Sequence, residues 1–458
     1  MRMRGRLLQV LEKAESGPIV TEKEFDNEYI RRPIAELVER YSVSWDKELA
    51  VPYDNDLADR VFLAGLELAR ETGLFCLDTS RRMIFSQAEL DEVITHTPAS
   101  VTLGEGADTV TINARRPDEE SRVVVVGGPY GIPVPEEHFA AIMLSYAQEP
   151  QIDFIDNASL VTTYGHPIRA GSPWEALACW QEADLSFEAI RRAGRPGMPI
   201  GCAENSPSAI GELTSTSYGG FRKTDWHHCC FVSELKTNYA ELTKAVHYAR
   251  TGSHVHTFYN PIYGGYAGGA AGMAVVIVAG MILLQACYMA CTVNPGPSHP
   301  FLSSDTHPDM IASQAVALQA LSRNTPLLVS AFARPVGGPG TKSILYECAA
   351  LTLAAVPSGI AFMEGVQSAT GRFVGHCSGL EARFTAQVAH AAEKLTRKEA
   401  NAIVKALTAK YVDSMESLPK GKPFQEVYDL RTVQPTPEWL QLYEEVCQEL
   451  RDEFGLRL

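Results

Sequence analysis

Eight short apolar runs from residue 123 onward constrain the fold of this chain most strongly. They cover residues 123–126, 153–155, 198–200, 225–232, 255–259, 288–293, 327–332 and 359–363. Most end in polar residues and a turn rich in Gly and Pro, and helix-length segments separate most of them. Strands that alternate with helices pair in parallel, and eight such units close into a (β/α)8 TIM barrel. We therefore expect an α/β barrel. A doubly wound open sheet is the main alternative, and the even number and spacing of the runs disfavour it.

The segments that flank these runs have a helical pattern. Apolar residues at helical spacing predict helices at 34–41 and 55–72, with Gly73 ending the second, and the C-terminal part is expected to be helical at 396–411 and 437–454. Residues 101–113 alternate, which predicts a hairpin over the end of the barrel. We therefore divide the chain into a mostly helical N-terminal extension (1–120), a barrel core (121–378) and a C-terminal helical region packed on the barrel (379–458).

The charge and cysteine content of the chain exclude several classes of function. A net charge of −15 and a pI near 5.3 disfavour nucleic acid or an anionic membrane as the main partner. The ten cysteines are scattered without a C-x-x-C pair, which is typical of reduced thiols in the cytoplasm. The basic N-terminus lacks a long apolar core, so we expect no secretory signal. No G-x-G-x-x-G fingerprint follows the first strand and no P-loop is present, so we predict no nucleotide cofactor.

One apolar segment, residues 270–293, is long enough to span a bilayer. It has neither basic flanks nor an aromatic belt, and it resolves into a helix at 273–285 and a strand at 288–293. We therefore interpret it as part of a soluble protein. A helix that is apolar all round is buried, and we expect this one at a subunit interface.

The polar and aromatic residues near the C-terminal ends of the strands are the candidates for a functional site. They are Gly201, Cys202, Glu204, Trp226, His227, His228, Cys229, Cys230, His254, His256, Phe258, Tyr259, Tyr263, Phe332, Arg334 and Glu364. Side chains alternate along a strand, so Trp226, His228 and Cys230 share one face. His227 and Cys229 share the opposite face, and His254, His256 and Phe258 form a further set.

These residue types suggest three kinds of binding. Histidines and thiols at neighbouring strand ends could bind Zn²⁺, with His228, Cys230, His256 and Cys202 as candidate ligands, although buried His and Cys are also common in cores. Trp226, Phe258, Tyr259, Tyr263 and Phe332 could wall a site for a quaternary ammonium through cation–π attraction, with plain packing as the alternative. Arg334 could clamp a substrate carboxylate or pair with an acid such as Glu364.

A glycine-rich loop, residues 260–269, follows the fifth of these strands. Its glycines suit the close approach of another backbone or of a large flat ligand, and a purely structural turn is the alternative.

Several long motifs resemble one known family. They are Cys76-Leu77-Asp78-Thr79, Gly127-Gly128-Pro129, Ala193-Gly194-Arg195-Pro196-Gly197-Met198, the loop 261–269, Gly379-Leu380-Glu381-Ala382-Arg383 and the segment 424–433. Together they resemble the monomethylamine:corrinoid protein methyltransferases of methanogens, through nearly the whole length of the chain. The resemblance implies a TIM barrel that assembles as a homo-oligomer, with a hexamer as one form. It also implies transfer of a methyl group from an amine to Co(I) of a corrinoid on a separate protein.

The chain departs from that family at the reactive positions. The family's pyrrolysine falls on Gly201, with Cys202 as the alternative register, and we expect Gly201 to leave open space in the substrate pocket. The acidic partners of pyrrolysine fall on His228 and Phe258. A glutamine and a tyrosine of the family fall on Phe332 and Arg334.

The expected activity follows from these departures. A quaternary or betaine-like donor leaves as a neutral amine, so the expected enzyme is a pyrrolysine-independent methyltransferase that moves this methyl group to the corrinoid. His228 and Glu204 are the expected catalytic residues. The expected substrate-binding residues are Gly201, Cys202, Trp226, Phe258, Tyr259, Phe332 and Arg334. Two alternatives stay open: a zinc-dependent methyltransferase for methanol, methoxy or methylthio donors, and a non-catalytic barrel that binds a small molecule or the corrinoid protein.

Overall fold

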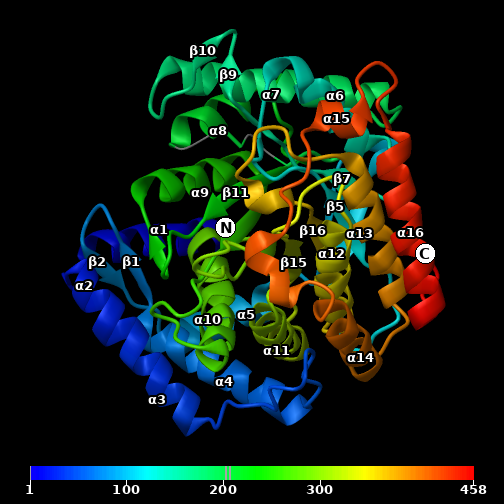
Figure 1. The fold of residues 1–458 in the computed structure, drawn as a ribbon. Helices are drawn as coiled ribbons and strands as arrows, with labels where there is room; N and C mark the ends of the chain where they lie inside the picture. The colour runs from blue at the N-terminus through cyan, green and yellow to red at the C-terminus, as the bar shows by residue number, and fades with distance from the viewer. Residues whose placement is uncertain (1, 202–203, 206–207) are drawn as a thin grey trace.

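The computed structural model describes residues 2–201, 204–205 and 208–458, and its centre is a ring of parallel strands (Figure 1). The ring positions are β5 (Val124–Gly127), β7 (Phe154–Ile155), residues 200 and 201, β11 (Trp226–Cys230), β13 (His254–Tyr259), β14 (Thr292–Pro295), β15 (Ser330–Ala333) and β16 (Phe362–Gly365). One sheet has the order β15-β16-β5-β7 and another has the order β11-β13-β14. Parallel bridges at Ile155–Ile200, Gly201–Trp226 and Val293–Val329 join them into a closed barrel. The predicted (β/α)8 fold is confirmed.

A helix follows each strand position and packs outside the ring. These helices are α6 (Glu136–Ala147), α7 (Pro173–Arg192), α8 (Ala209–Ser215), α9 (Tyr239–Thr251), α10 (Ala270–Tyr288), α11 (Pro308–Asn324), α12 (Lys342–Ala355) and α13 (Gly379–Ala392). The predicted barrel core ended at residue 378, which lies between β16 and α13. The eighth helix of the barrel, α13, therefore lies in the segment that we assigned to the C-terminal region. Short paired segments lie in the loops: β6 (Pro133–Val134) with β8 (Ser159–Leu160), and β9 (Thr162–Thr163) with β10 (His166–Pro167).

One predicted boundary was wrong. The strand expected at 288–293 starts later, because α10 continues to Tyr288 and β14 begins at Thr292. After β11, β12 (Lys236–Thr237) first pairs with β1 (Leu74–Cys76) of the N-terminal extension, and the helix α9 begins only at Tyr239.

The burial of α10 explains its composition. By length and composition it is the one helix of the described residues that could cross a membrane, and 89% of its apolar window is buried inside this chain. Helix α4 (Asn55–Thr72) packs along it, with α3 (Arg32–Arg40), α5 (Gln87–His96) and α11 around it. A Cβ at Gly65 of α4 would overlap Val278 of α10, so the two helices approach closely. The cover over α10 therefore comes from its own chain and not from the subunit interface that we expected.

The N-terminal extension wraps one side of the barrel, in blue in Figure 1. Its other elements are α1 (Arg2–Ser16), α2 (Glu22–Glu24), the π-helix η1 (Phe25–Arg31), β2 (Arg81–Met83), β3 (Ser100–Leu103), the 3₁₀ turn η2 (Gly106–Asp108) and β4 (Val110–Asn113). The predicted helices α3 and α4 are confirmed, and Gly73 ends α4 with a φ of 64°. The predicted hairpin is β3–β4. It lies against the N-terminal ends of the strands, where Gly104 and Glu105 donate backbone hydrogen bonds to Thr224 and Gly197.

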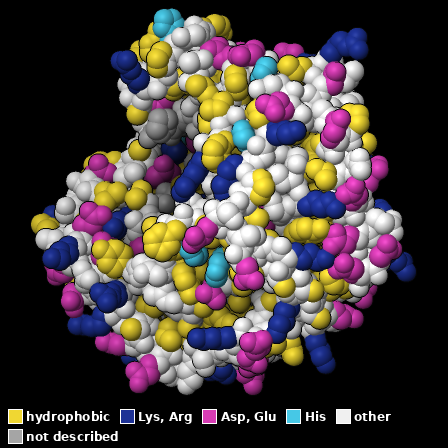
Figure 2. Space-filling model, viewed as in Figure 1, with side chains coloured by type: hydrophobic (Ala, Val, Ile, Leu, Met, Phe, Trp, Pro, Cys, Tyr) yellow, Lys and Arg dark blue, Asp and Glu magenta, His cyan; other side chains and the backbone are white. Residues whose placement is uncertain are grey.

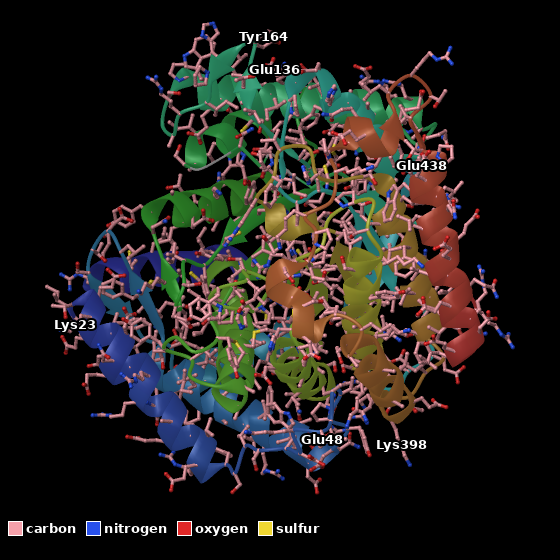
Figure 3. All side chains as sticks on the ribbon, in the orientation of Figure 1. Lys23, Glu48, Glu136, Tyr164, Lys398 and Glu438 are labelled. Atoms are coloured by element: carbon pink, nitrogen blue, oxygen red, sulfur yellow. The ribbon has the colours of Figure 1, made fainter. Side chains whose placement is uncertain are left out.

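The C-terminal helices cover the opposite side, in orange and red in Figure 1. The elements are η3 (Ser368–Gly371), α14 (Arg397–Thr408), η4 (Val412–Ser417), α15 (Phe424–Val427), β17 (Tyr428–Asp429), β18 (Gln434–Pro435) and α16 (Pro437–Phe454). Both predicted helices are present, and α14 and α16 pack on α12. Charged side chains such as Lys23, Lys398 and Glu438 lie at the periphery (Figure 3).

Candidate functional site

A histidine held between two carboxylates lies at the C-terminal ends of the second, third and fourth strands. His228 of β11 places Nε2 3.2 Å from Asp156 Oδ2 and Nδ1 3.2 Å from Glu204 Oε1. The Asp156 side chain is fully buried and that of Glu204 is 21% exposed. We call these three residues the Asp–His–Glu cluster. On one face of the molecule, Figure 2 shows a hollow between the part that carries α7 and α8 and the rest of the barrel.

Two glycines at the C-terminal end of the first strand, Gly127 and Gly128, allow the Asp156 backbone to lie close to that strand. Asp156 N donates to Gly127 O at 2.8 Å, and a Cβ at Gly128 would overlap the Asp156 backbone. Gly128 also has a φ of 155°, which favours glycine. Burial raises the pKa of Asp156 and the Glu204 carboxylate raises it further, while His228 opposes both effects.

A buried acid fixes the backbone that carries Glu204. Glu182 of α7 accepts hydrogen bonds from the backbone N–H groups of Glu204 at 3.0 Å and Asn205 at 3.3 Å, and from Asn205 Nδ2 at 2.6 Å. It also accepts from Leu160 N at 3.0 Å. Burial raises the pKa of Glu182 to about 8. These bonds orient the segment so that Glu204 faces His228.

A second acid–histidine pair lies deeper in the barrel. His256 Nε2 is 3.6 Å from Glu364 Oε2, and both side chains are fully buried. Glu364 Oε1 accepts hydrogen bonds from Asn294 Nδ2 at 2.6 Å and from Ser330 Oγ. Burial raises the pKa of Glu364 to about 8 and holds the pKa of His256 well below its usual value. Both groups are therefore mainly neutral near pH 7.

Phe258 borders the Asp–His–Glu cluster, and Phe332 packs beside Phe258. The ring centroid of Phe258 is 5.1 Å from that of His228, edge to face. Phe332 lies 6.4 Å from Phe258 and 4.8 Å from Tyr130, centroid to centroid. Trp226 stacks on His256 at 3.7 Å and is fully buried, so it forms part of the barrel floor.

Arg334, at the end of the seventh strand, is bound by carbonyl groups. Its Nη2 donates to Gly296 O at 3.2 Å and to Pro297 O at 3.1 Å. Arg334 forms no ion pair with Glu364. Burial lowers the pKa of Arg334, and the nearby acid Asp305 opposes this effect. The buried Arg334 Nε has no hydrogen-bond acceptor among the described residues.

Other candidate residues lie outside this cluster. As alternation predicts, His227 stacks on Tyr248 of α9 and Cys229 Sγ contacts Glu241 O of the same helix. Tyr259 is fully buried against α10 and donates to Glu234 at 2.7 Å. His254, at the start of β13, contacts Cys291 at the N-terminal end of the barrel.

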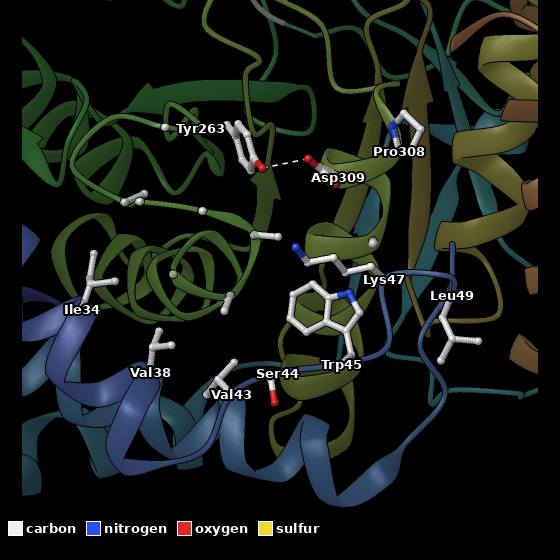
Figure 4. Close-up of a pocket in the computed structure, with 18 of the residues that line it drawn as sticks. Ile34, Val38, Val43, Ser44, Trp45, Lys47, Leu49, Tyr263, Pro308 and Asp309 are labelled. Carbon is white, nitrogen blue, oxygen red and sulfur yellow. Dashed lines mark hydrogen bonds between the residues drawn. The ribbon is translucent and has the colours of Figure 1, made fainter. Parts of the chain in front are cut away.

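Tyr263 and the glycine-rich loop line a separate cavity of about 1030 Å³. Tyr263 donates to Asp309 at 2.7 Å, and Trp45 and Lys47 line another side (Figure 4). The cavity lies between the loop, the N-terminal extension and the start of α11.

The structure does not gather the zinc ligands proposed from the sequence. Cys202 lies outside the described residues. Cys230 donates its backbone N–H to Glu241, and burial raises the pKa of its thiol to about 12. Among the residues that the structure describes, the donors close enough to share one ion are Asp156, Glu204 and His228, whose ligand atoms lie within 4.8 Å of one another.

Gly201 does not leave the open space that we expected. A Cβ at this position would overlap the Asp156 carboxylate, and the Gly201 carbonyl accepts a hydrogen bond from Asn157 Nδ2 at 3.0 Å. Sequence reasoning therefore missed Asp156. The signal was present, because Asp156 directly follows an apolar run in the way that the other candidates do. Glu182 lies inside a helix and carries no such signal.

The chemistry of the site follows from its charges. Two carboxylates and an imidazole can bind a cation or exchange a proton, and no Lys or Arg of the described residues forms an ion pair with Asp156 or Glu204. The flanking phenylalanine rings favour a cation with apolar substituents.

Comparisons with known proteins agree along nearly the whole chain. The family model of monomethylamine methyltransferase MtmB matches residues 6–456. The monomethylamine methyltransferase MtmB2 of Methanosarcina acetivorans is 33% identical over 97% of both chains, and MtmB of Methanosarcina mazei is 32% identical over 96% of both. The crystal structure of Methanosarcina barkeri MtmB superposes with a TM-score of 0.96 at 31% identity, covering 99% of this chain and 98% of that one. A hydroxylamine complex of MtmB gives the same values. The chain therefore belongs to the monomethylamine methyltransferase MtmB family.

Proposed function

We propose that the protein moves a methyl group from a quaternary or betaine-like amine to Co(I) of a corrinoid on a separate protein. The observation that carries this proposal is the Asp–His–Glu cluster, a largely buried pair of carboxylates beside the Phe258 ring. It supports binding of a methylated cation. We further propose, from the resemblance and the scattered cysteines, that the enzyme is a cytoplasmic homo-oligomer.

Such a donor needs no covalent adduct with the enzyme. The C–N bond breaks, its electron pair leaves with nitrogen as a neutral amine, and the electron pair of Co(I) forms the new bond to the methyl carbon. The protein contributes position and a water-poor site. Asp156 and Glu204 would hold the positive charge of the donor, and the rings of Phe258 and Phe332 would contact its methyl groups.

The position of Arg334 supports the betaine-like form of this donor. Its buried Nε, which has no acceptor in the described part of the chain, lies near the seventh strand end, where a ligand carboxylate would supply one. The Asp156 carboxylate takes up the space beside Gly201 where a side chain would lie. This supports a reaction that uses no long catalytic side chain at position 201.

Anaerobic transfer to reduced cobalamin tests the proposal. The protein is mixed with cob(I)alamin and, separately, tetramethylammonium, choline, glycine betaine or monomethylamine, and formation of methylcobalamin is followed by absorbance and mass spectrometry. We expect transfer from at least one quaternary donor, and much slower transfer from monomethylamine. Transfer from monomethylamine alone would contradict the proposed substrate. Binding of a quaternary amine without transfer, also in the presence of a corrinoid protein, would identify a non-catalytic barrel.

A further inference from the structure

The barrel mouth contains a buried carboxylate, that of Asp156, whose oxygens have unused capacity to accept hydrogen bonds. Asp156 is fully buried and lies 3.2 Å from His228 Nε2, but in the described part of the chain neither of its oxygens accepts a hydrogen bond of good geometry. Buried charges are normally paired or coordinate a metal. Asp156 faces His228 and Glu204, which also carry atoms able to bind a metal.

We propose that Asp156, Glu204 and His228 bind one divalent transition-metal ion, Zn²⁺ or a chemically similar ion. One carboxylate oxygen from each acid and one imidazole nitrogen lie within 4.8 Å of one another. Bonds of about 2 Å to a tetrahedral ion require donor separations of about 3.3 Å. His228 faces Asp156 with Nε2 and Glu204 with Nδ1, so one ion bound at Nε2 requires the Glu204 carboxylate to move toward Asp156. Glu204 is partly exposed and its side chain can make this movement, while Asp156 is fully buried.

The surroundings of the cluster suit a metal site in two ways. Three protein donors leave a coordination position for a fourth ligand, which is the arrangement of reactive zinc sites. The Glu204 backbone is held by Glu182, and the Asp156 backbone is held by Gly127, so two of the donors start from fixed positions. An imidazole with two carboxylates favours Zn²⁺ or another first-row ion over Mg²⁺ or Ca²⁺.

This donor set differs from the one that the sequence suggested, because it contains no thiolate. Cys230 and His256 are therefore expected to be dispensable for metal binding. If the proposed function is correct, a bound ion would neutralise the charge that holds the cationic donor. Zn²⁺ is then expected to weaken the binding of tetramethylammonium, and this part alone rests on the proposed function.

Metal binding to the full-length protein tests the proposal without any methyl donor. After treatment with a chelator, titration calorimetry with Zn²⁺ is expected to give about one ion per chain for the wild type. Asp156→Asn and His228→Ala are expected to weaken this binding about 100-fold or more. His138→Ala, on α6, and Cys230→Ser are the matched controls and should bind as the wild type does. Co²⁺ in place of Zn²⁺ should give ligand-field bands without a thiolate charge-transfer band.

The outcomes that overturn the proposal are distinct from a failure of folding. Thermal melting of each variant establishes that it is folded before its binding is measured. If the wild type binds no stoichiometric Zn²⁺, the proposal is wrong. The charge of the two carboxylates is then balanced by protons or by the substrate alone. Loss of binding in Cys230→Ser with retention in both Asp156→Asn and His228→Ala would assign the ion to a thiolate site elsewhere.

Discussion

The Asp156 carboxylate fills the space that any side chain at Gly201 would require. The two residues lie on neighbouring strand positions, joined by the bridge between Ile155 and Ile200 and by the hydrogen bond from Gly201 N to Ile155 O at 2.7 Å. At position 201 the third strand therefore contributes only backbone, and the carboxylate that lies there comes from Asp156 of the second strand. The place of the Asp156 carboxylate in the cluster depends on glycine at position 201.

Replacing Gly201 by alanine is expected to push Asp156 away from His228. The added methyl group overlaps a fully buried carboxylate, and such overpacking costs about 1–3 kcal/mol of unfolding free energy. Urea denaturation should show this loss, and methyl transfer to cob(I)alamin should fall with it.

Gly269→Ala is the matched control for this substitution. Its φ is −79° and no atom lies within 4 Å of its added Cβ, so both stability and activity should stay unchanged. Equal stability of Gly201→Ala and the wild type would contradict the overlap with Asp156.

The buried Glu364 is expected to make stability fall as pH rises. Its pKa is raised from 4.5 to about 8, so between these values the folded state holds a proton that the unfolded state releases. The free energy of unfolding therefore decreases by about 1.4 kcal/mol per pH unit from this group, and the loss is complete above about pH 8. Glu364→Gln should remove this contribution, which urea denaturation from pH 5 to pH 8.5 would measure.

Other buried acids, among them Glu182, contribute in the same direction, so the difference between variant and wild type is the informative quantity. Glu438→Gln, at the periphery on α16, serves as the control and should reproduce the wild-type slope. Parallel curves for Glu364→Gln and the wild type would show that Glu364 is ionised in the folded protein.

The sequence was sufficient for the barrel and insufficient for the site. Apolar runs of strand length between helix-length segments indicate parallel strands covered by helices, because each run needs burial on both faces. The helix α10 is buried almost entirely by other parts of its own chain. Its apolar pattern alone could not show whether α4 or another subunit buries it. Contacts between strand ends are not local either. The meeting of Asp156 with His228 depends on barrel closure, and the orientation of Tyr259 toward α10 depends on which face of β13 points inward.

Arg334 is expected to determine whether a donor with a carboxylate is used. Loss of a charged hydrogen bond costs about 1.5–3 kcal/mol, so Arg334→Gln should lower kcat/KM for glycine betaine by roughly 10- to 100-fold. Tetramethylammonium has no carboxylate, and its kcat/KM should change little in the same protein. Arg372→Gln, whose side chain donates to Ser303, is the control. Equal losses for both donors would assign Arg334 a structural role through the carbonyl groups of Gly296 and Pro297.

Phe258 is expected to recognise the positive charge of the donor through its ring. Phe258→Leu keeps an apolar side chain and removes the π-system, whose attraction for a cation is about 0.5–2 kcal/mol. Binding of choline, measured by calorimetry, should therefore weaken by roughly 2- to 30-fold. The neutral isostere 3,3-dimethylbutanol should bind equally well to Phe258→Leu and the wild type, because its contact is hydrophobic only. Phe301→Leu, on an exposed loop, should leave the binding of both compounds unchanged. A parallel loss for choline and its isostere would mean that Phe258 acts by packing, and the cation would then be held by the carboxylates of Asp156 and Glu204 alone.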